Sequence, residues 1–334
     1  MSEVKNPLEF PLLKDWVRMV RDSPDPEWLL DRLLPSQGFV LLSGAPKVSM
    51  KTWWAKAAGL AVASGLPIGP LKPVDTKGKP VLMIAQEGAP KPSGRRFDML
   101  TKGVGLDIEK VDKFYMGHRV KNFFMDDPVQ VDNMLDWCLD KEIELLILDP
   151  LAQIFRGDEN SAQSMGKVMQ AVKRFVDEKI TVLVTHHLNK GGEDGMRDID
   201  ADIRGSSALA GAYDAHLALR VSEGERWIKM HTRYKDDENR SWNVAWHIDK
   251  EKADATLQMH EQDGEHFDEA MLEHMAMVLI PGATYTEGRL RKLWNCGDKI
   301  VLKTVDIFVQ QGKLELMSSG KWSCTKPTKG GENG

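Results

Sequence analysis

The sequence predicts an α/β protein with a doubly wound, mainly parallel sheet and a small additional C-terminal domain. Short apolar runs recur along the chain, and stretches of helical length separate them. Apolar runs with little polar alternation are typical of strands buried on both faces. The composition changes after residue 248, which separates the C-terminal part from the rest.

Composition excludes several classes of protein. The net charge of -5 argues against a uniformly basic nucleic-acid coat, so a nucleic-acid surface must be local or created by assembly. The three cysteines are widely spaced and form no C-x-x-C pair, which argues against a disulfide framework and a zinc site. The N-terminus lacks signal-peptide features, and no apolar stretch approaches the roughly 20 residues of a membrane span. We therefore expect a cytoplasmic protein.

A phosphate-binding loop is expected after the first buried strand. Residues 39–42 are apolar, a turn begins at Gly44, and Lys51 and Thr52 come immediately before a helix predicted over residues 53–64. In a P-loop, backbone N–H groups and the helix N-terminus surround phosphates, the lysine neutralises them and the hydroxyl binds Mg²⁺. The residues expected to bind nucleotide are Gly44, Ala45, Pro46, Lys47, Val48, Ser49, Met50, Lys51, Thr52 and Trp53.

The match to the P-loop pattern is imperfect. Six residues separate Gly44 from Lys51 where the usual pattern has five, and Met50 takes the place of the second glycine. The alternative interpretation is a plain strand-turn-helix corner with a surface lysine. Trp53 and Trp54 could stack on a base, although packing in the core or at an interface is the other reading.

Glu87 is the candidate general base. It follows a second apolar run at residues 80–85, and we expect that strand to lie next to the P-loop strand, where open α/β sheets bind ligands. A carboxylate there could deprotonate the water that attacks the γ-phosphate. The alternative is a solvated glutamate at a strand end.

Asp149 is the candidate Mg²⁺ carboxylate. Residues 143–149 form an apolar run that ends in this aspartate, which is the Walker B form: a buried strand carries its carboxylate to the sheet edge, where it holds Mg²⁺ through water. Buried strands also end in aspartate by chance.

Another buried strand is expected over residues 180–185, followed by His186 and His187. Neighbours in an extended chain point to opposite faces, so the two histidines are not expected to chelate one metal. One of them is a candidate γ-phosphate sensor, with core packing or backbone capping as the alternative. The polar, glycine-rich stretch 191–202 suggests a mobile loop that could face the channel of a ring.

The C-terminal part has the outline of a winged helix. Helices are expected over residues 269–278, 285–294 and 298–311, and a short hairpin over 313–324. Residues 281–330 hold nine basic and four acidic side chains, in a chain that is acidic overall. Such a local basic surface can hold phosphate backbones. Docking of a protein partner is the alternative.

These observations give a domain division. We expect an N-terminal arm at 1–37, the ATPase domain at 38–248, a linker at 249–268, a winged-helix domain at 269–326 and a disordered tail at 327–334. The arm is expected to pack against the core or a neighbouring subunit.

The motifs together resemble a known group. GAPKVSMKTWW, VLMIAQEG, LLILDPLAQIFRGDENSAQSM, VLVTHHLNKGG and DIRGSSALAGAYD follow one another between residues 24 and 221. In this order and spacing they are similar to the RecA-like P-loop ATPases of the RepA type, which are hexameric replicative helicases of plasmids and phages related to the DnaB helicases.

The resemblance implies roles for these residues. Lys51 and Thr52 would bind phosphate and Mg²⁺, Glu87 would be the catalytic base, Asp149 the Walker B carboxylate, and His186 or His187 the sensor. Arg204 matches an RGSS segment near the subunit interface, so it is the candidate arginine finger, with Arg220 in reserve. The alternative is that Arg204 only orders its own loop.

The expected function is a Mg²⁺-dependent ATPase that assembles into a homo-hexameric ring and moves along single-stranded DNA during phage or plasmid replication in a bacterial cell. A replication protein could dock on the winged helix. One alternative is a RecA-like recombination or single-strand annealing ATPase. The other is a non-enzymatic DNA-binding adaptor with a degenerate P-loop.

Overall fold

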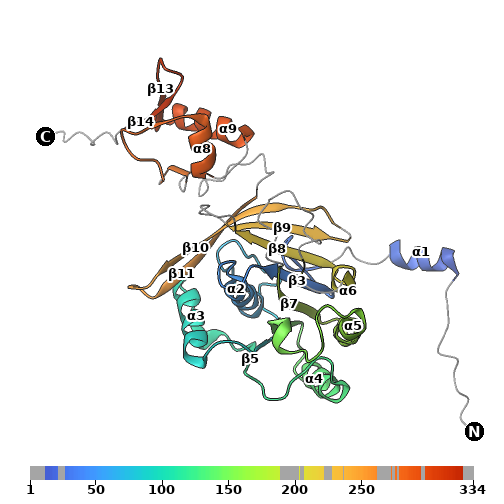
Figure 1. The fold of residues 1–334 in the computed structure, drawn as a ribbon. Coiled ribbons are helices and arrows are strands. Elements are labelled where there is room, and N and C mark those ends of the chain that lie inside the picture. Colours follow the sequence, from blue (N-terminus) through green and yellow to red (C-terminus); the bar gives the residue numbers. More distant parts are fainter. Residues whose placement is uncertain are drawn as a thin grey trace, which may run out of the picture.

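A nine-stranded sheet forms the centre of the protein (Figure 1). The computed structural model describes residues 12–21, 27–188, 203, 207–221, 228–235, 237–261, 272, 275–276, 278–294 and 298–325. The strand order is β11-β10-β9-β8-β3-β7-β6-β4-β5. From β8 to β5 neighbouring strands run parallel, and β9, β10 and β11 add to the β8 edge as antiparallel strands. The predicted α/β class with a mainly parallel sheet is therefore confirmed, and it is consistent with a RecA-like P-loop core.

The strands of this sheet are β3 (Phe39–Gly44), β4 (Val81–Ala85), β5 (Phe114–His118), β6 (Leu145–Asp149), β7 (Thr181–His187), β8 (Ala215–Val221), β9 (Ile228–Tyr234), β10 (Ser241–Asp249) and β11 (Asp254–Glu261). The helices around it are α2 (Lys51–Ser64), α3 (Pro90–Gly103), α4 (Pro128–Asp140), α5 (Ala162–Asp177) and the short α6 (Ser207–Ala210), with 3-10 turns η1 (Ile108–Lys110) and η2 (Leu151–Gln153).

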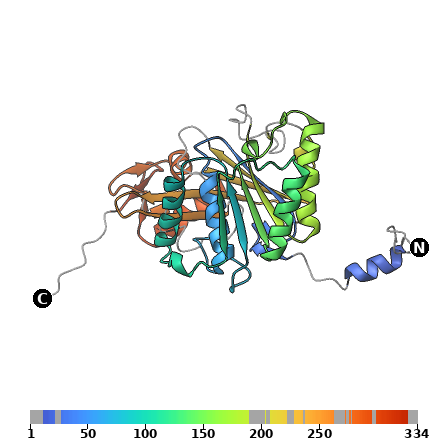
Figure 2. The ribbon, with the colours of Figure 1, turned by 90° about the horizontal axis from the view of Figure 1, so that it is seen from below.

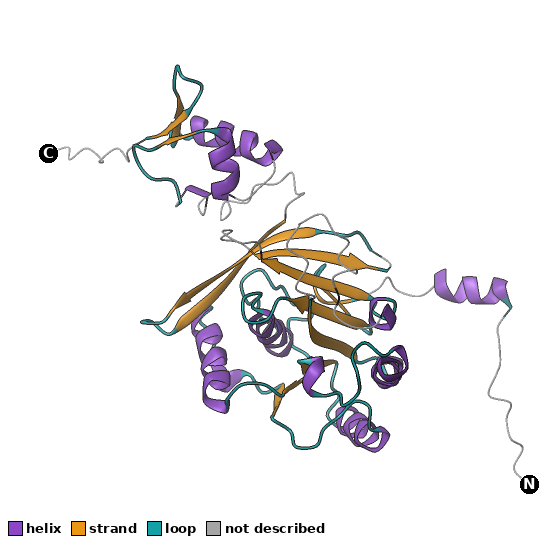
Figure 3. Ribbon diagram, viewed as in Figure 1, coloured by secondary structure: helices purple, strands orange, loops and turns teal. Residues whose placement is uncertain are grey.

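The sheet separates two apolar cores. Along β3, Val40 and Leu42 pack in a core with α2 and α3, whereas Phe39 and Leu41 pack on the opposite face with α4 and α5. Successive side chains of a strand point to opposite faces, so a strand covered on both sides must be apolar throughout. Figures 2 and 3 show helices on both faces of the sheet. This explains why the strands read as continuous apolar runs.

Local signals in the sequence set the helix ends. The Ser161 hydroxyl accepts a hydrogen bond from the Ser164 N–H and caps α5. Gly65 ends α2 in the left-handed conformation, with φ of 68°, as a C-terminal glycine is expected to do. The helix predicted after the P-loop is thus confirmed.

The N-terminal part differs from the predicted arm. It contains α1 (Leu13–Arg21) and two short antiparallel strands, β1 (Trp28–Leu30) and β2 (Leu34–Pro35). Leu30 and Leu34 are fully buried in the α2-side core, so from residue 27 onward this segment is part of the body built on the nine-stranded sheet. The leucines at 29, 30, 33 and 34 pack in the same core as α2, which is one of the two positions expected for the arm.

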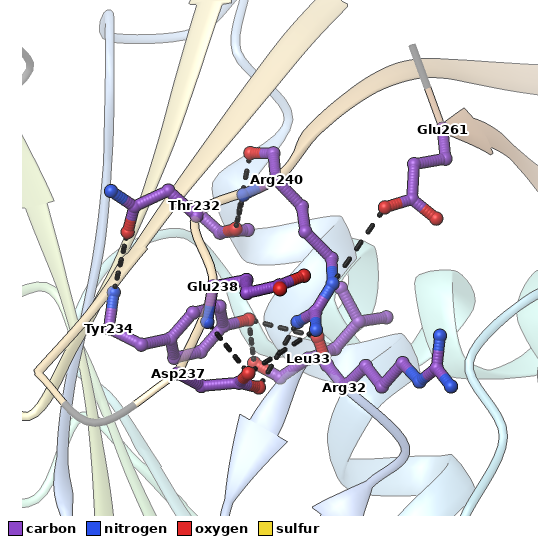
Figure 4. A network of polar contacts seen from close by, with 9 residues as sticks. Arg32, Leu33, Thr232, Tyr234, Asp237, Glu238, Arg240 and Glu261 are labelled. Carbon is purple, nitrogen blue, oxygen red and sulfur yellow. Dashed lines mark hydrogen bonds and ion pairs between the residues drawn. The ribbon is translucent and has the colours of Figure 1, made fainter. Parts of the chain in front are cut away.

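A polar network fixes this segment to the far strands (Figure 4). The Tyr234 hydroxyl on β9 donates to the carbonyl oxygens of Arg32, at 3.0 Å, and Leu33, at 3.3 Å. Arg240 forms ion pairs with Asp237, at 3.2 Å, and Glu261, at 3.8 Å. The Tyr234 hydroxyl thereby links the turn between β1 and β2 to β9. The ion pairs of Arg240 link the turn between β9 and β10 to the end of β11.

The predicted linker at 249–268 is wrong over its first half. Residues 254–261 form β11, which pairs with residues 242–249 of β10. The acidic composition hid an alternation in which Ala255, Leu257 and Met259 are buried. The hairpin packs closely on its surroundings: a Cβ at Gly103 would lie 2.2 Å from the Ala255 carbonyl oxygen, so α3 and β11 can approach only because that residue is glycine. β10 also pairs with β9 in antiparallel fashion.

The C-terminal unit contains β12 (Thr284–Tyr285), α8 (Glu287–Trp294), α9 (Asp298–Gln310), β13 (Leu314–Leu316) and β14 (Trp322–Cys324). Its three strands are ordered β12-β14-β13, and Trp294 and Phe308 meet edge to face in its own apolar core. The last two predicted helices and the hairpin are confirmed. The helix expected at 269–278 lies largely outside the described residues, as does the tail at 327–334. None of the helices in the described ranges has the length and apolar character needed to cross a membrane.

Candidate nucleotide site

The turn between β3 and α2 depends on Gly44. A Cβ at this position would lie 2.5 Å from the Ser49 hydroxyl oxygen and 2.9 Å from the Leu219 carbonyl oxygen, so a larger residue would clash with both the loop and β8. Ser49 is buried, and its hydroxyl donates a 2.6 Å hydrogen bond to the Ala45 carbonyl oxygen. The loop is therefore closed on itself by its own residues.

Met50 has a left-handed backbone. It is the N-cap of α2, with φ of 59° and ψ of 23°, a conformation that glycine adopts most easily. The usual P-loop glycine before the lysine is replaced here by a residue that keeps the left-handed conformation. With Met50 in this conformation, the backbone enters α2 along a path that a glycine at the same position could also follow.

The extra residue of the loop is accommodated at its tip. Lys47 also has a positive φ, of 67°, and Val48 is 54% exposed. Pro46 and Val48 close a tight turn through a 2.8 Å backbone hydrogen bond. The added length therefore extends outward, and Ser49 and Lys51 stay at the buried base.

Lys51 is folded back onto the loop. Its Nζ donates to the carbonyl oxygens of Gly44, at 2.7 Å, and Ala45, at 3.2 Å, and to the Ser49 hydroxyl, at 3.2 Å. Burial lowers the pKa of Lys51 to about 8, and the nearby carboxylates of Asp149 and Glu87 partly oppose that shift. An anion in the cavity would favour the charged form of this lysine.

A cavity of about 250 Å³ lies beside the loop, at the C-terminal ends of β4, β6 and β7. The predicted site residues that line it are Lys47, Ser49, Met50, Lys51, Thr52, Trp53, Glu87, Asp149 and His187. These residues come from separate motifs that the fold brings to one edge of the sheet. Ligands of open α/β sheets bind at this edge.

Asp149 ends β6 at the cavity and is almost completely buried. Its Oδ1 accepts a hydrogen bond of 2.5 Å from the hydroxyl of Thr185 on the adjacent strand β7. Thr52 and Asp149 line the same cavity, and hydroxyl and carboxylate oxygens are the ligands that Mg²⁺ prefers. Among the described residues, no group of three or more His, Cys, Asp or Glu side chains lies close enough together to hold a metal ion.

Glu87 reaches the cavity by a different route from the one expected. Its strand, β4, is not next to the P-loop strand, because β7 and β6 lie between them. Strands that are consecutive in sequence are separated here by a crossover through α2, and the later strands fill the gap. Glu87 nevertheless lines the cavity because the loop after β4 turns toward it.

The two histidines separate as the strand alternation requires. His187 lines the cavity, whereas His186 is 1% exposed and does not. Of the two sensor candidates, His187 is therefore the one placed near the phosphate loop.

The arginine-finger candidates have different outcomes. Arg204 and the loop at 191–202 lie outside the described residues. Arg220 is 8% exposed, near the end of β8, and its backbone register pairs it with Lys229 on β9. Arg220 directly follows Leu219, which pairs with Gly44 of β3, and its role as an arginine finger stays a prediction.

The tryptophans also differ. Trp54 is fully buried, so its packing role is clear. Trp53 lines the cavity, and its ring lies 5.7 Å from that of Trp246 on β10 and 5.7 Å from the guanidinium carbon of Arg96 on α3. Trp53 therefore both lines the cavity and packs against β10.

Sequence reasoning missed three residues of this site. Thr185, Ser93 and Arg96 all line the cavity. Thr185 reads as the last residue of an apolar strand, and α3 reads as a basic amphipathic helix. The position of Thr185 directly before the histidine pair is the one signal that could have indicated it.

Comparisons with known proteins agree with this geometry. A family model described as an AAA domain matches residues 6–193, more than half of the chain. No curated protein gives a significant match.

Proposed function

Since the chain belongs to this AAA domain family of P-loop ATPases, we propose that it binds ATP with Mg²⁺ in the cavity beside β3 and hydrolyses it to drive movement along single-stranded DNA. One observation carries the ATPase part of the proposal: Lys51, Thr52, Glu87 and Asp149 line one cavity although they come from three separate motifs. A positive charge, a hydroxyl and two carboxylates at one sheet edge are the groups that phosphoryl transfer requires.

Each residue then has a role. Lys51 and the N-terminus of α2 would hold the β- and γ-phosphates, and Thr52 and Asp149 would hold Mg²⁺, the latter through water. When bound, the ion would supply positive charge to the phosphates. Glu87 orients and deprotonates the attacking water, and His187 responds to the γ-phosphate. The catalytic water would stand between Glu87 and the phosphate held by Lys51.

The action on DNA rests on two further observations. The motifs resemble the RepA and DnaB-related helicases in order and spacing, and the C-terminal unit has two helices followed by a hairpin, as a winged helix does. Its net positive charge contrasts with the acidic chain as a whole. In a homo-hexameric ring, a few basic residues from each subunit would suffice to bind a single strand in the channel.

Two measurements test this function. The first is oligomer mass in the presence of ATP, Mg²⁺ and single-stranded DNA, and the second is unwinding of a forked duplex. The proposal predicts a ring-sized assembly and ATP-dependent unwinding. Filaments with ATP hydrolysis but no unwinding would favour the recombination alternative. DNA binding without any hydrolysis would favour the adaptor.

A further inference from the structure

A second lysine is buried near the site. Lys56 lies on α2, one helical turn after Thr52, and is completely shielded from solvent. It forms no ion pair with any of the described residues. Fully buried lysines without an acidic partner are rare, because an ammonium loses its hydration on burial.

The Lys56 ammonium is satisfied by one helix alone. Its Nζ donates to the Ser93 hydroxyl, at 2.7 Å, and to the Ser93 carbonyl oxygen, at 3.1 Å. It also lies 3.9 Å from the centre of the Phe97 ring, at a distance typical of a cation–π contact. Ser93 and Phe97 are four residues apart and so lie on one face of α3. The two hydrogen bonds and the cation–π contact of the ammonium are therefore all made with this face.

These contacts join the two halves of the candidate site. Ser93 is in the first turn of α3, which begins three residues after Glu87, and it lines the cavity itself. Lys56 belongs to the helix that begins with Lys51 and Thr52. Lys56 thus links the phosphate-binding helix to the turn that directly follows the candidate base.

An apolar side chain in this position would stabilise the folded protein more than a buried ammonium does. Lys56 is surrounded by residues of the α2-side core, and replacing a buried charge by a well-packed apolar residue is often neutral or stabilising. Burial, and to a smaller extent Arg96, lower the pKa of Lys56 to about 8, and Asp149 partly opposes this shift. The ammonium therefore interacts with Arg96 and Asp149 of the cavity. Its burial lowers the free energy of unfolding, and a methionine at the same position would not have this effect.

We propose that Lys56 is a positioning residue for ATP hydrolysis: through Ser93 it holds the first turn of α3, and with it the Glu87 loop, against the helix that carries Lys51 and Thr52. This inference rests on the ATPase function proposed above. The role is geometric, because Lys56 does not line the cavity. Displacement of a catalytic group by about 1 Å can lower a rate on the order of 100-fold.

The test compares Lys56→Met with Lys91→Met in the full-length protein. Lys91 is an exposed lysine of the first turn of α3 and controls for the loss of a charge there. We expect the kcat for ATP of Lys56→Met to fall roughly 10- to 100-fold, while its dissociation constant for a non-hydrolysable ATP analogue stays within about threefold of wild type. The melting temperature should not fall. Lys91→Met should behave as wild type.

Other outcomes are also decisive. A Lys56→Met protein with the kcat of Lys91→Met would overturn the inference while leaving the ATPase function intact. If wild type shows no hydrolysis, the proposed function and the inference both fail. If Lys56→Met does not fold, Ser93→Ala decides: it removes the hydroxyl acceptor alone, and a kcat at least about threefold below wild type is expected, whereas an unchanged kcat overturns the inference.

Discussion

The hydroxyl of Thr185 donates a 2.5 Å hydrogen bond to Oδ1 of Asp149 across the adjacent strands β7 and β6. The bond fixes the orientation of a carboxylate at the cavity, on the edge where the strands end. Loss of a group that orients a metal-binding side chain typically lowers metal affinity or activity by about 10- to 100-fold.

Thr185→Val should therefore lower the apparent affinity for Mg²⁺ in ATP hydrolysis. With the donor lost, we expect the Mg²⁺ concentration for half-maximal hydrolysis to rise about 10-fold, in the range seen for such supporting groups. The measurement is a Mg²⁺ titration of ATP turnover. Thr181→Val is the matched control, because Thr181 lies at the other end of the same strand and bonds to Gln37 instead. An equal shift in both variants would contradict the assignment.

Glu87→Gln should separate binding from hydrolysis. The amide keeps the size of the side chain but cannot take a proton, so turnover is expected to fall by about 10²- to 10⁴-fold while nucleotide affinity is retained. Turnover and binding of a fluorescent ATP analogue are the two readouts. Glu109→Gln, at an exposed position on η1, should leave both unchanged. Full activity of Glu87→Gln would remove this residue from the mechanism.

Met50 offers a test of the loop geometry. The left-handed conformation costs a non-glycine residue about 1–2 kcal/mol, and a β-branched residue more. Met50→Gly relieves that strain but loses side-chain contacts, so its free energy of unfolding should stay within about 1 kcal/mol of wild type. Met50→Val should be destabilised by about 2 kcal/mol. Urea unfolding gives both values, and equal stability of the Val and Gly variants would contradict the left-handed assignment.

The stability of the protein should depend on pH through Lys56. Its pKa is lowered from 10.5 to about 8 in the folded chain, so the unfolded chain binds more protons between those values. The contribution of Lys56 to the free energy of unfolding therefore rises with pH between these two values. Below a pH of about 8 the destabilisation caused by the buried charge is complete.

The matched comparison is again Lys56→Met. This variant should be more stable than wild type at about pH 7, and the difference should shrink as the pH approaches about 10. Lys51 has a similar shift but is present in both proteins, so its contribution cancels. A stability difference that does not change with pH would show that burial does not lower the pKa of Lys56. Urea unfolding of both proteins at several pH values measures this stability difference.

The sequence predicts the core of this fold well because its signals are local. Each parallel strand is an apolar run, and the ends of α2 and α5 are marked by Gly65 and Ser161. The lateral order of the strands has no such signal. β4 was therefore expected beside β3, whereas two later strands occupy that space. The strand β11 was missed because its polar positions are acidic and resemble a linker.

The candidate site divides in the same way. Lys51, Thr52 and Asp149 belong to patterns with fixed spacing from their strands, and they line the expected cavity. Thr185 and Lys56 belong to no such pattern. Their significance comes from partners 36 and 37 residues away, Asp149 and Ser93, which only the packed structure brings within hydrogen-bond distance.

The most direct test of the central claim is ATP hydrolysis by wild type and Lys51→Ala, each with and without single-stranded DNA. Lys110→Ala, at an exposed position, is the control for loss of a lysine. The account predicts turnover that DNA stimulates in wild type and in Lys110→Ala, and that falls by at least about 100-fold in Lys51→Ala because the phosphates lose their cation. Hydrolysis that persists in Lys51→Ala, or that is absent from a wild-type protein that still binds DNA, would contradict it.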